Sequence, residues 1–259
     1  MSNPLDYSGK VVIVTGGSRG IGRGISERFL AAGADVVICG RNQPDELPQA
    51  GERRARFCVA DVRDVDQITQ VVDFTMEHFA RLDVLINNAG GAPEADAATA
   101  SPRFSEAIVR LNLLAPLNFA QRANAVMQQQ DQGGAIVNIA SVSATRPSPG
   151  TAAYGAAKAG LLSLTQSLAV EWAPRVRINA VTAGMIETEQ AHLHYGDAEG
   201  IAAVAATVPL ERMGAPGDVG DACLFLASPL ASYVSGANLL MHGGGEKPAF
   251  LSAAKNTSA

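Results

Sequence analysis

The fold is decided by the stretch Val11-Val12-Ile13-Val14-Thr15-Gly16-Gly17-Ser18-Arg19-Gly20-Ile21-Gly22. A short run of β-branched residues leads into closely spaced glycines and then into an amphipathic segment, which predicts a buried strand, a tight turn and a helix. Small residues let the backbone bend tightly, and the free N–H groups at a helix N-terminus attract phosphate. Glycine-rich turns also end strands for structural reasons alone, so the turn by itself leaves both uses open.

The rest of the chain repeats the same alternation of short apolar runs and longer amphipathic segments. Strands are expected at Val11–Thr15, Asp35–Cys39, Arg56–Ala60, Val84–Asn87, Ala135–Ala140, Arg177–Val181 and Ala237–Met241. Helices are expected at Ile21–Ala32, Asp64–Arg81, Pro102–Gln130, Ala152–Ala173 and Pro216–Ala227. Near-continuous apolar strands joined by helical crossovers are typical of parallel sheets. The sequence therefore predicts an α/β, single-domain doubly wound Rossmann fold, with helices on both faces of a seven-stranded parallel sheet.

Composition and charge bound the class of protein and its partners. With 259 residues, of which 47% are hydrophobic and 17% charged, residues 1–259 are expected to form one domain around one large core. A net charge of -5 without a basic run favours a small-molecule partner over nucleic acid. The polar N-terminus and the absence of a long apolar run predict a cytoplasmic protein without a membrane span. Cys39, Cys58 and Cys223 lack metal-ligand spacing, so no metal site is expected.

In this fold, the turn after the first strand holds a dinucleotide pyrophosphate. Its contacts are expected from Gly16, Ser18, Arg19, Gly20 and Ile21, although the spacing Gly-x-x-x-Gly-x-Gly differs from the general Gly-x-Gly-x-x-Gly.

The end of the second strand indicates which dinucleotide is bound. An acidic residue there accepts hydrogen bonds from the ribose hydroxyls of NAD, whereas this chain has Gly40 followed by Arg41. Arg41 and Arg19 can place two guanidinium groups on a 2′-phosphate, which is a strong and geometrically specific arrangement. NADP(H) is therefore predicted over NAD(H); two solvated surface arginines are the alternative.

Candidate catalytic residues follow the fifth predicted strand. Tyr154 and Lys158 are four residues apart on a predicted helix, so their side chains share one face. A phenol is a poor base at neutral pH, and a nearby ammonium together with an oxidised nicotinamide favours its ionised form. Ser141 ends the preceding strand on the side where parallel sheets bind ligands, and its hydroxyl can bind a substrate oxygen. A Tyr-x-x-x-Lys pair found alone is more often surface decoration; its position after the serine-bearing strand favours acid/base chemistry.

With these motifs, the chain resembles the short-chain dehydrogenase/reductase family from about Gly9 to Gly244. The likeness to 3-oxoacyl-thioester reductases is general. It implies hydride transfer between a nicotinamide and a carbonyl or alcohol carbon, with Tyr154 as acid/base, Ser141 positioning the substrate oxygen and Lys158 binding the nicotinamide ribose. It also implies that Asn112 holds a water in a proton relay that runs to Lys158. Without the family, Asn112 would be interpreted as a polar residue at a helix kink.

The resemblance assigns further cofactor contacts to several loops. Asn88, Ala89 and Gly90 lie in an Asn-Asn-Ala-Gly turn that lines the adenosine side and steadies the sheet. Asp61 and Val62 would contact the adenine, and Ile186 and Thr188 would contact the carboxamide and phosphates. Ala183 stands where the family usually has proline, so a more mobile loop is expected.

The substrate and the assembly are predicted in less detail. The segment 187–210 is expected to be a substrate lid with a mainly apolar pocket, which favours a hydrophobic acyl thioester or an alicyclic, steroid-derived compound. The tail 245–259 would cover a neighbouring subunit's pocket or be disordered. Family members form tetramers, so a homotetramer is expected, with a dimer as the alternative. An alternative function is a cofactor-binding regulatory or structural protein without turnover.

Overall fold

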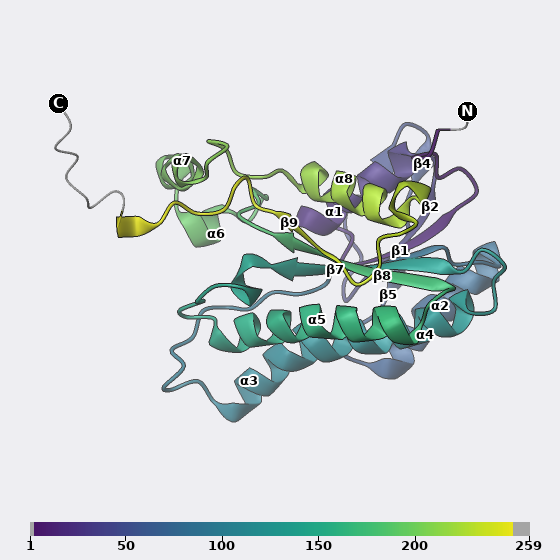
Figure 1. Cartoon of the computed structure of the whole chain (residues 1–259), viewed down its shortest axis with the longest axis horizontal. Coiled ribbons are helices and arrows are strands. Elements are labelled where there is room, and N and C mark those ends of the chain that lie inside the picture. Colours follow the sequence, from purple (N-terminus) through teal and green to yellow (C-terminus); the bar gives the residue numbers. More distant parts are fainter. Residues whose placement is uncertain (1–2, 251–259) are drawn as a thin grey trace.

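The computed structural model describes residues 3–250 of the chain. Its centre is a parallel sheet of seven strands in the order β5-β2-β1-β6-β7-β8-β9 (Figure 1). The strands are β1 (Val11–Thr15), β2 (Asp35–Gly40), β5 (Arg56–Val59), β6 (Val84–Asn87), β7 (Gly134–Ser141), β8 (Val176–Ala183) and β9 (Asn238–Met241). The predicted fold class is confirmed, and the strand positions agree with the sequence analysis to within two residues at each end.

Helices cover both faces of the sheet in two layers (Figure 1). One layer holds α1 (Gly20–Ala31) and α8 (Pro216–Ala227), and the other holds α2 (Val65–Phe79), α4 (Ala115–Met127) and α5 (Ala152–Glu171). Because successive side chains of a strand point to opposite faces, β1 contributes Val12 and Val14 to one core and Ile13 to the other. Each face therefore buries its own apolar cluster, which removes the water that would compete for the strand hydrogen bonds.

The predicted helix Pro102–Gln130 is interrupted. It consists of α3 (Pro102–Val109), a π-helical turn at Arg110–Leu114, and α4. Pro116 has no N–H to donate to the carbonyl of Asn112 four residues earlier, so the regular helical ladder cannot continue there. The wider turn that results places Asn112 inside the protein, where it is fully buried.

Some short elements were not predicted. A small antiparallel hairpin, β3 (Gln49–Ala50) with β4 (Arg53–Arg54), follows β2, and its strands are too short to leave a periodic pattern. The expected lid contains two helices, α6 (His192–Tyr195) and α7 (Ala198–Thr207). No helix among residues 3–250 has the length and apolar character needed to cross a membrane. The part of the predicted tail from residue 251 onward lies outside the described residues.

The connectivity of the sheet positions the site. From β1 the chain builds outward to β2 and β5, then returns to the other side of β1 with β6. Loops at the carboxyl ends of β1 and β6 consequently leave in opposite directions and open a crevice between them, where open parallel sheets bind their ligands.

A buried carboxylate holds the opposite end of these strands. Asp83 accepts hydrogen bonds from the backbone N–H of Val11 (2.9 Å), from Lys10 Nζ (3.1 Å) and from Arg81 Nε (2.8 Å). Burial alone would raise the pKa of Asp83, but the hydrogen bonds from Arg81, Val11 and Lys10 outweigh it and lower the pKa below its ordinary value. Asp83 thereby joins the starts of β1 and β6 while it remains charged.

Asp83→Asn should reduce the free energy of unfolding by about 1–3 kcal/mol at neutral pH, because charge-assisted hydrogen bonds to a buried group are lost. Since the folded pKa lies below the unfolded value, this contribution is complete above about pH 4 and is lost as the pH falls through the folded pKa. Urea unfolding across this pH range measures the effect, with the exposed Asp35→Asn as the control. A difference that stays constant or grows as the pH falls contradicts the assignment.

Candidate active site

A cleft of about 800 Å³ opens at the carboxyl ends of the strands. It brings together the predicted site residues except Asn112 and Ile186. Those that line it are Gly16, Ser18, Arg19, Gly20, Ile21, Arg41, Asp61, Val62, Asn88, Ala89, Gly90, Ser141, Tyr154, Lys158 and Thr188. Residues separated by more than a hundred positions in the sequence therefore face one cavity.

The glycine-rich turn has the shape of a phosphate cradle. Gly20 begins α1 with a φ of +51°, a conformation that L side chains rarely adopt. A Cβ on Gly22 would lie 2.2 Å from the carbonyl oxygen of Gly16, so the helix and the turn pack together only because this residue is glycine. The first N–H groups of α1 point into the cleft end of this turn, where a pyrophosphate would be stabilised by hydrogen bonds and by the helix dipole. The turn thus fits a dinucleotide.

The turn after β6 is locked onto this cradle. Asn88 Nδ2 donates to the carbonyl oxygens of Thr15 (2.9 Å) and Gly16 (3.3 Å). Thr15 Oγ1 in return accepts from the backbone N–H groups of Asn88 and Ala89, each at 2.9 Å. These contacts tie the ends of β1 and β6 together, so both walls of the crevice keep a constant separation.

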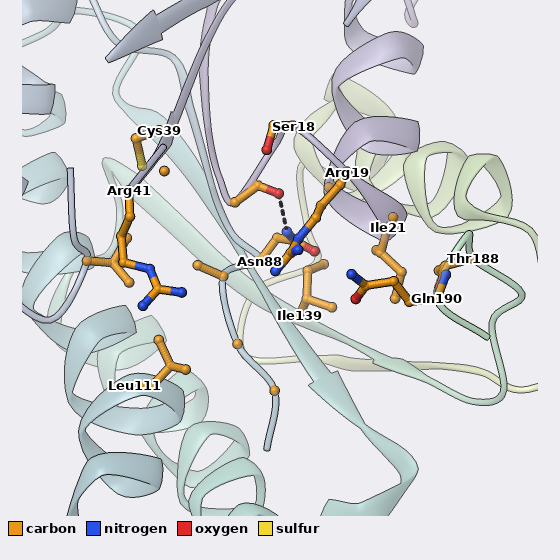
Figure 2. Close-up of a pocket in the computed structure, with 18 of the residues that line it drawn as sticks. Ser18, Arg19, Ile21, Cys39, Arg41, Asn88, Leu111, Ile139, Thr188 and Gln190 are labelled. Carbon is orange, nitrogen blue, oxygen red and sulfur yellow. Dashed lines mark hydrogen bonds between the residues drawn. The ribbon is translucent and has the colours of Figure 1, made fainter. Parts of the chain in front are cut away.

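Two arginines face the middle of the cleft. Figure 2 shows Arg19, from the glycine-rich turn, and Arg41, from the end of β2, with their guanidinium groups directed into the cavity. Asp61 lies on the same wall and accepts from Arg63 Nε at 2.9 Å. That hydrogen bond is the largest influence on the pKa of Asp61, and with the nearby charge of Arg41 it lowers the pKa below its ordinary value. Asp61 is therefore ionised and paired at neutral pH.

Ser141, Tyr154 and Lys158 meet at one end of the cleft. Ser141 is the last residue of β7, and its Oγ accepts from the backbone N–H of Ser143 at 3.2 Å. Tyr154 projects from the first turn of α5 and lines the cleft together with Ser141, whose side chain acts to lower the pKa of the phenol. Lys158, one turn later, is 3% exposed, and its Nζ donates to the carbonyl oxygen of Ile139 at 2.7 Å.

Burial dominates the electrostatics of this trio. Burial raises the pKa of Tyr154; the Ser141 side chain lowers it in part, and Tyr195 raises it further. Lys158 Nζ lies over the tyrosine ring, 5.7 Å from its centroid. Burial also lowers the pKa of Lys158, to about 8. Among the protein's own groups, desolvation of the phenol therefore sets the direction of its pKa shift. That the ammonium and an oxidised nicotinamide together favour the phenolate stays a prediction.

Asn112 lies behind the cleft wall and contacts the backbone. Its Nδ2 donates to the carbonyl oxygens of Gly91 and Ile108, and its Oδ1 accepts from the N–H of Gly91, all at 2.9 Å. A Cβ on Gly90 would lie 2.7 Å from Asn112 Oδ1 and 3.3 Å from Lys158 Nζ, so only glycine fits this close to both side chains. Asn112 therefore shapes the loop beside Lys158, and Pro116, four residues later, was the sequence signal for its position.

The loop after β8 differs in detail from the prediction. The side chain of Ile186 does not line the cleft; it packs into the apolar cluster on the α1 and α8 side and contacts Gly214. It points inward because Ile186 forms a β-bridge with Gly214, which turns the neighbouring Thr188 toward the cleft. Ala183 is buried as the last residue of β8, and the N–H of Gly184 donates to the carbonyl oxygen of Met241 at 2.9 Å.

Glu189 and Gln190 line the cleft and were not singled out by the sequence. Glu189 Oε1 accepts from the N–H of Gly20 at 2.9 Å, so a lid carboxylate bonds to the first residue of α1. Glu189 and Gly20 are 169 positions apart in the sequence, and no local sequence pattern predicts their contact. Among residues 3–250, no group of three His, Cys, Asp or Glu side chains is arranged to hold a metal ion.

Comparisons with known proteins agree with this geometry. A family model described as enoyl-(acyl carrier protein) reductase matches residues 16–246. The L-rhamnose 1-dehydrogenase (NAD(P)(+)) of Azotobacter vinelandii is 38% identical over 91% of this chain and 96% of its own. The 3alpha-hydroxysteroid dehydrogenase of Mediterraneibacter gnavus is 35% identical over 90% of this chain and 96% of its own. The 3-oxoacyl-[acyl-carrier-protein] reductase of Thermotoga maritima is 35% identical over 93% and 99%.

Among solved structures, the aldohexose dehydrogenase of Thermoplasma acidophilum in ligand-free form has a TM-score of 0.85 and 31% identity, and the match covers 98% of each chain. A dinucleotide-type crevice with a Ser, Tyr and Lys trio at one end defines an oxidoreductase of alcohols and ketones. The chain belongs to the short-chain dehydrogenase/reductase family, whose members use nicotinamide cofactors.

Glu189→Gln should tighten binding of the nicotinamide cofactor by about three- to tenfold, because the carboxylate competes with a phosphate for the N–H of Gly20 and repels it. Isothermal titration of the purified protein with the cofactor measures the change. Glu187→Gln, two residues earlier in the same segment, is the matched control and should leave the affinity unchanged. Weaker cofactor binding by Glu189→Gln would show that Glu189 supports the site and does not compete for it.

Proposed function

We propose that this protein is an NADP(H)-dependent oxidoreductase that interconverts a ketone and a secondary alcohol, with Tyr154 as the acid/base. The observation that carries the proposal is the pair of Ser141 and Tyr154 in the same cleft as the phosphate cradle, with Lys158 beside them. A regulatory protein that only bound the nucleotide would need the cradle but not this pair. The alternative of a cofactor-binding protein without turnover is therefore disfavoured.

The residues divide the chemistry among them. A bound nicotinamide supplies or accepts the hydride. Ser141 donates a hydrogen bond to the substrate oxygen and holds it next to the Tyr154 hydroxyl, which gives or takes the proton there. Because burial raises the pKa of Tyr154, the hydroxyl keeps its proton at neutral pH, as the reduction of a ketone requires. Lys158 would hold the nicotinamide ribose and, with Asn112 behind it, would return a proton to Tyr154 after reduction and carry one away after oxidation.

The preference for NADP(H) rests on Gly40 and on the two arginines that face the cleft. Gly40 lines the cavity at the end of β2, and the nearest atom to a Cβ placed there would be 3.7 Å away, in Phe57. Glycine puts no side chain and no negative charge at this position, whereas an acidic side chain would repel a 2′-phosphate. Arg19 and Arg41 approach the same region and can share the phosphate charge. Thr188, which lines the cleft, and the backbone around Ile186 are proposed to contact the nicotinamide end of the cofactor.

The substrate is proposed to be bulky and largely apolar. A second cavity of about 280 Å³ adjoins the reaction end of the cleft, and its apolar walls include Val142, Met185 and Val208. Its volume suits an alicyclic ring or an acyl chain. Relatives that act on hydroxysteroids and on 3-oxoacyl groups support this class, whereas the rhamnose dehydrogenase shows that sugars are handled by similar chains.

The protein is proposed to act in the cytoplasm as a homotetramer. Val170 on α5 is 80% exposed and Leu240 on β9 is 52% exposed, so an outer helix and the edge strand each present apolar surface. Such surfaces favour association with further copies of the chain.

Tyr154→Phe should reduce turnover by at least about a thousandfold while the affinity for the nicotinamide cofactor changes little, because only the proton carrier is removed. A panel of ketones and secondary alcohols, followed by nicotinamide absorbance, measures turnover, and titration measures binding. Tyr233→Phe, at a fully exposed tyrosine, is the control. Retained turnover in Tyr154→Phe would remove the proposed chemistry.

Gly40→Asp combined with Arg41→Ala should shift the preference from NADP(H) toward NAD(H) by about a hundredfold in the ratio of kcat/KM values. The substitutions remove one charge-assisted contact to the 2′-phosphate and add a carboxylate for the ribose hydroxyls. Arg54→Ala, at an exposed arginine on β4, is the control. An unchanged ratio would show that Arg41 is a solvated surface residue and does not bind the 2′-phosphate.

A further inference from the structure

The second cavity has a polar end that the proposed mechanism does not use. It is bounded by the loop after Ser141, by the end of β8 and by the segment after β9, and Gly184 lines both this cavity and the main cleft. The segment after β9 runs past the lid helices (Figure 1), and its Gly243 and Gly244 lie against Val208 and Pro209. The cavity therefore lies next to the end of the cleft that Ser141 and Tyr154 line.

One permanent positive charge faces this cavity. Among the described residues that line it, Arg146 carries the guanidinium, and Nη2 pairs with Glu246 Oε1 at 2.7 Å. Each of the two side chains is about 40% exposed. An ion pair so open to water is weak, because solvent screens its attraction and both long side chains lose freedom. A second carboxylate can therefore displace Glu246 from Arg146 at a small cost in free energy.

Tyr195 lies within electrostatic range of both the ion pair and Tyr154. Burial is the main reason that the pKa of Tyr195 is raised, while Arg146 lowers it and Glu246 raises it. Tyr195 in turn acts on Tyr154. A compound that reaches from Tyr154 along this cavity consequently arrives at the guanidinium of Arg146.

We propose that the substrate carries a carboxylate in addition to its ketone or hydroxyl group, that Arg146 binds this carboxylate, and that Glu246 pairs with the guanidinium until the substrate displaces it. The inference rests on the proposed function and names the substrate class of the same site. The apolar walls between the two polar ends hold the body of the molecule. Glu246 itself shows that a carboxylate fits against Arg146 in this position.

A purely structural role, in which the ion pair of Arg146 and Glu246 joins two loops, explains this contact less well. A half-exposed pair adds little stability, so it is a poor fastener for the segment after β9. A substrate carboxylate makes a stronger bond to the same guanidinium, because the apolar body of the substrate displaces water from the cavity around it. The ion pair of Arg146 with Glu246 is thus weak, whereas the bond of Arg146 to a substrate carboxylate is strong once the substrate fills the cavity.

The test compares oxo acids with their neutral esters. Levulinate, its longer straight-chain homologues and cyclohexanone carboxylate are each assayed beside the matching methyl ester, with consumption of the reduced nicotinamide cofactor as the signal. In the unaltered protein, kcat/KM should favour at least one acid over its ester. In R146Q this acid-to-ester ratio should fall by about ten- to a hundredfold, and R146K should restore part of it. In E246Q the ratio should rise by about two- to fivefold, since the competing carboxylate is gone.

The surface pair Arg122–Asp73, at 2.9 Å, supplies the control D73N, which should leave the ratio unchanged. Cofactor affinity, measured by titration, should be the same in all variants. Three results overturn the inference: no acid preferred over its ester, an R146Q ratio equal to that of the unaltered protein, or a lowered ratio in E246Q. If neither acids nor esters nor any other carbonyl compound is reduced, the proposed function itself fails.

Discussion

The burial of one positive charge at the end of the cleft constrains the rest of the site. Lys158 is almost fully enclosed, and its ammonium donates to the carbonyl oxygen of Ile139. Burying an ammonium is costly unless it finds polar partners, and the Ile139 carbonyl is one. A Cβ on Gly90 would crowd both Lys158 Nζ and Asn112 Oδ1, so glycine keeps this space free. The π-helical turn exists at the point where Pro116 interrupts the ladder, and it is this turn that brings Asn112 inward. A backbone irregularity and a glycine therefore shape the surroundings of the same buried charge.

Burial moves the pKa values of the two ionisable groups of the trio apart. The pKa of Tyr154 is raised, which by itself makes the phenol a good proton donor and a poor base. The pKa of Lys158 is lowered to about 8, so its charge is held less firmly than that of a surface lysine. A positive charge that arrives beside Tyr154 acts in the same low-dielectric surroundings and is felt strongly. The protein thus supplies a dry environment in which a charged nicotinamide can change the proton affinity of the phenol.

The cofactor end and the substrate end of the molecule are built on different principles. The cradle is made of short-range turns, locked by Thr15 and Asn88, and its geometry is set by backbone groups. The substrate end is assembled from the loop after Ser141, the lid and the segment after β9, which meet only through side chains such as Arg146 and Glu246. The backbone geometry of the cradle is compatible with few substitutions, whereas the loop side chains at the substrate end can be replaced by many other residues. This difference explains how relatives that act on sugars, steroids and acyl carriers share one cleft.

The sequence by itself determined the strands, the main helices, the glycine-rich turn and the positions of Ser141, Tyr154 and Lys158 on their elements, because each depends on residues close together in the chain or on the period of an element. It did not predict the two-residue strands of the hairpin, nor that the side chain of Ile186 packs into the core. Only the tertiary structure decided the raised pKa of Tyr154, the bond from Gly20 to Glu189 and the pairing of Arg146 with Glu246. Desolvation and contacts across a hundred or more residues arise when separate loops meet, and no local pattern encodes which loops will do so.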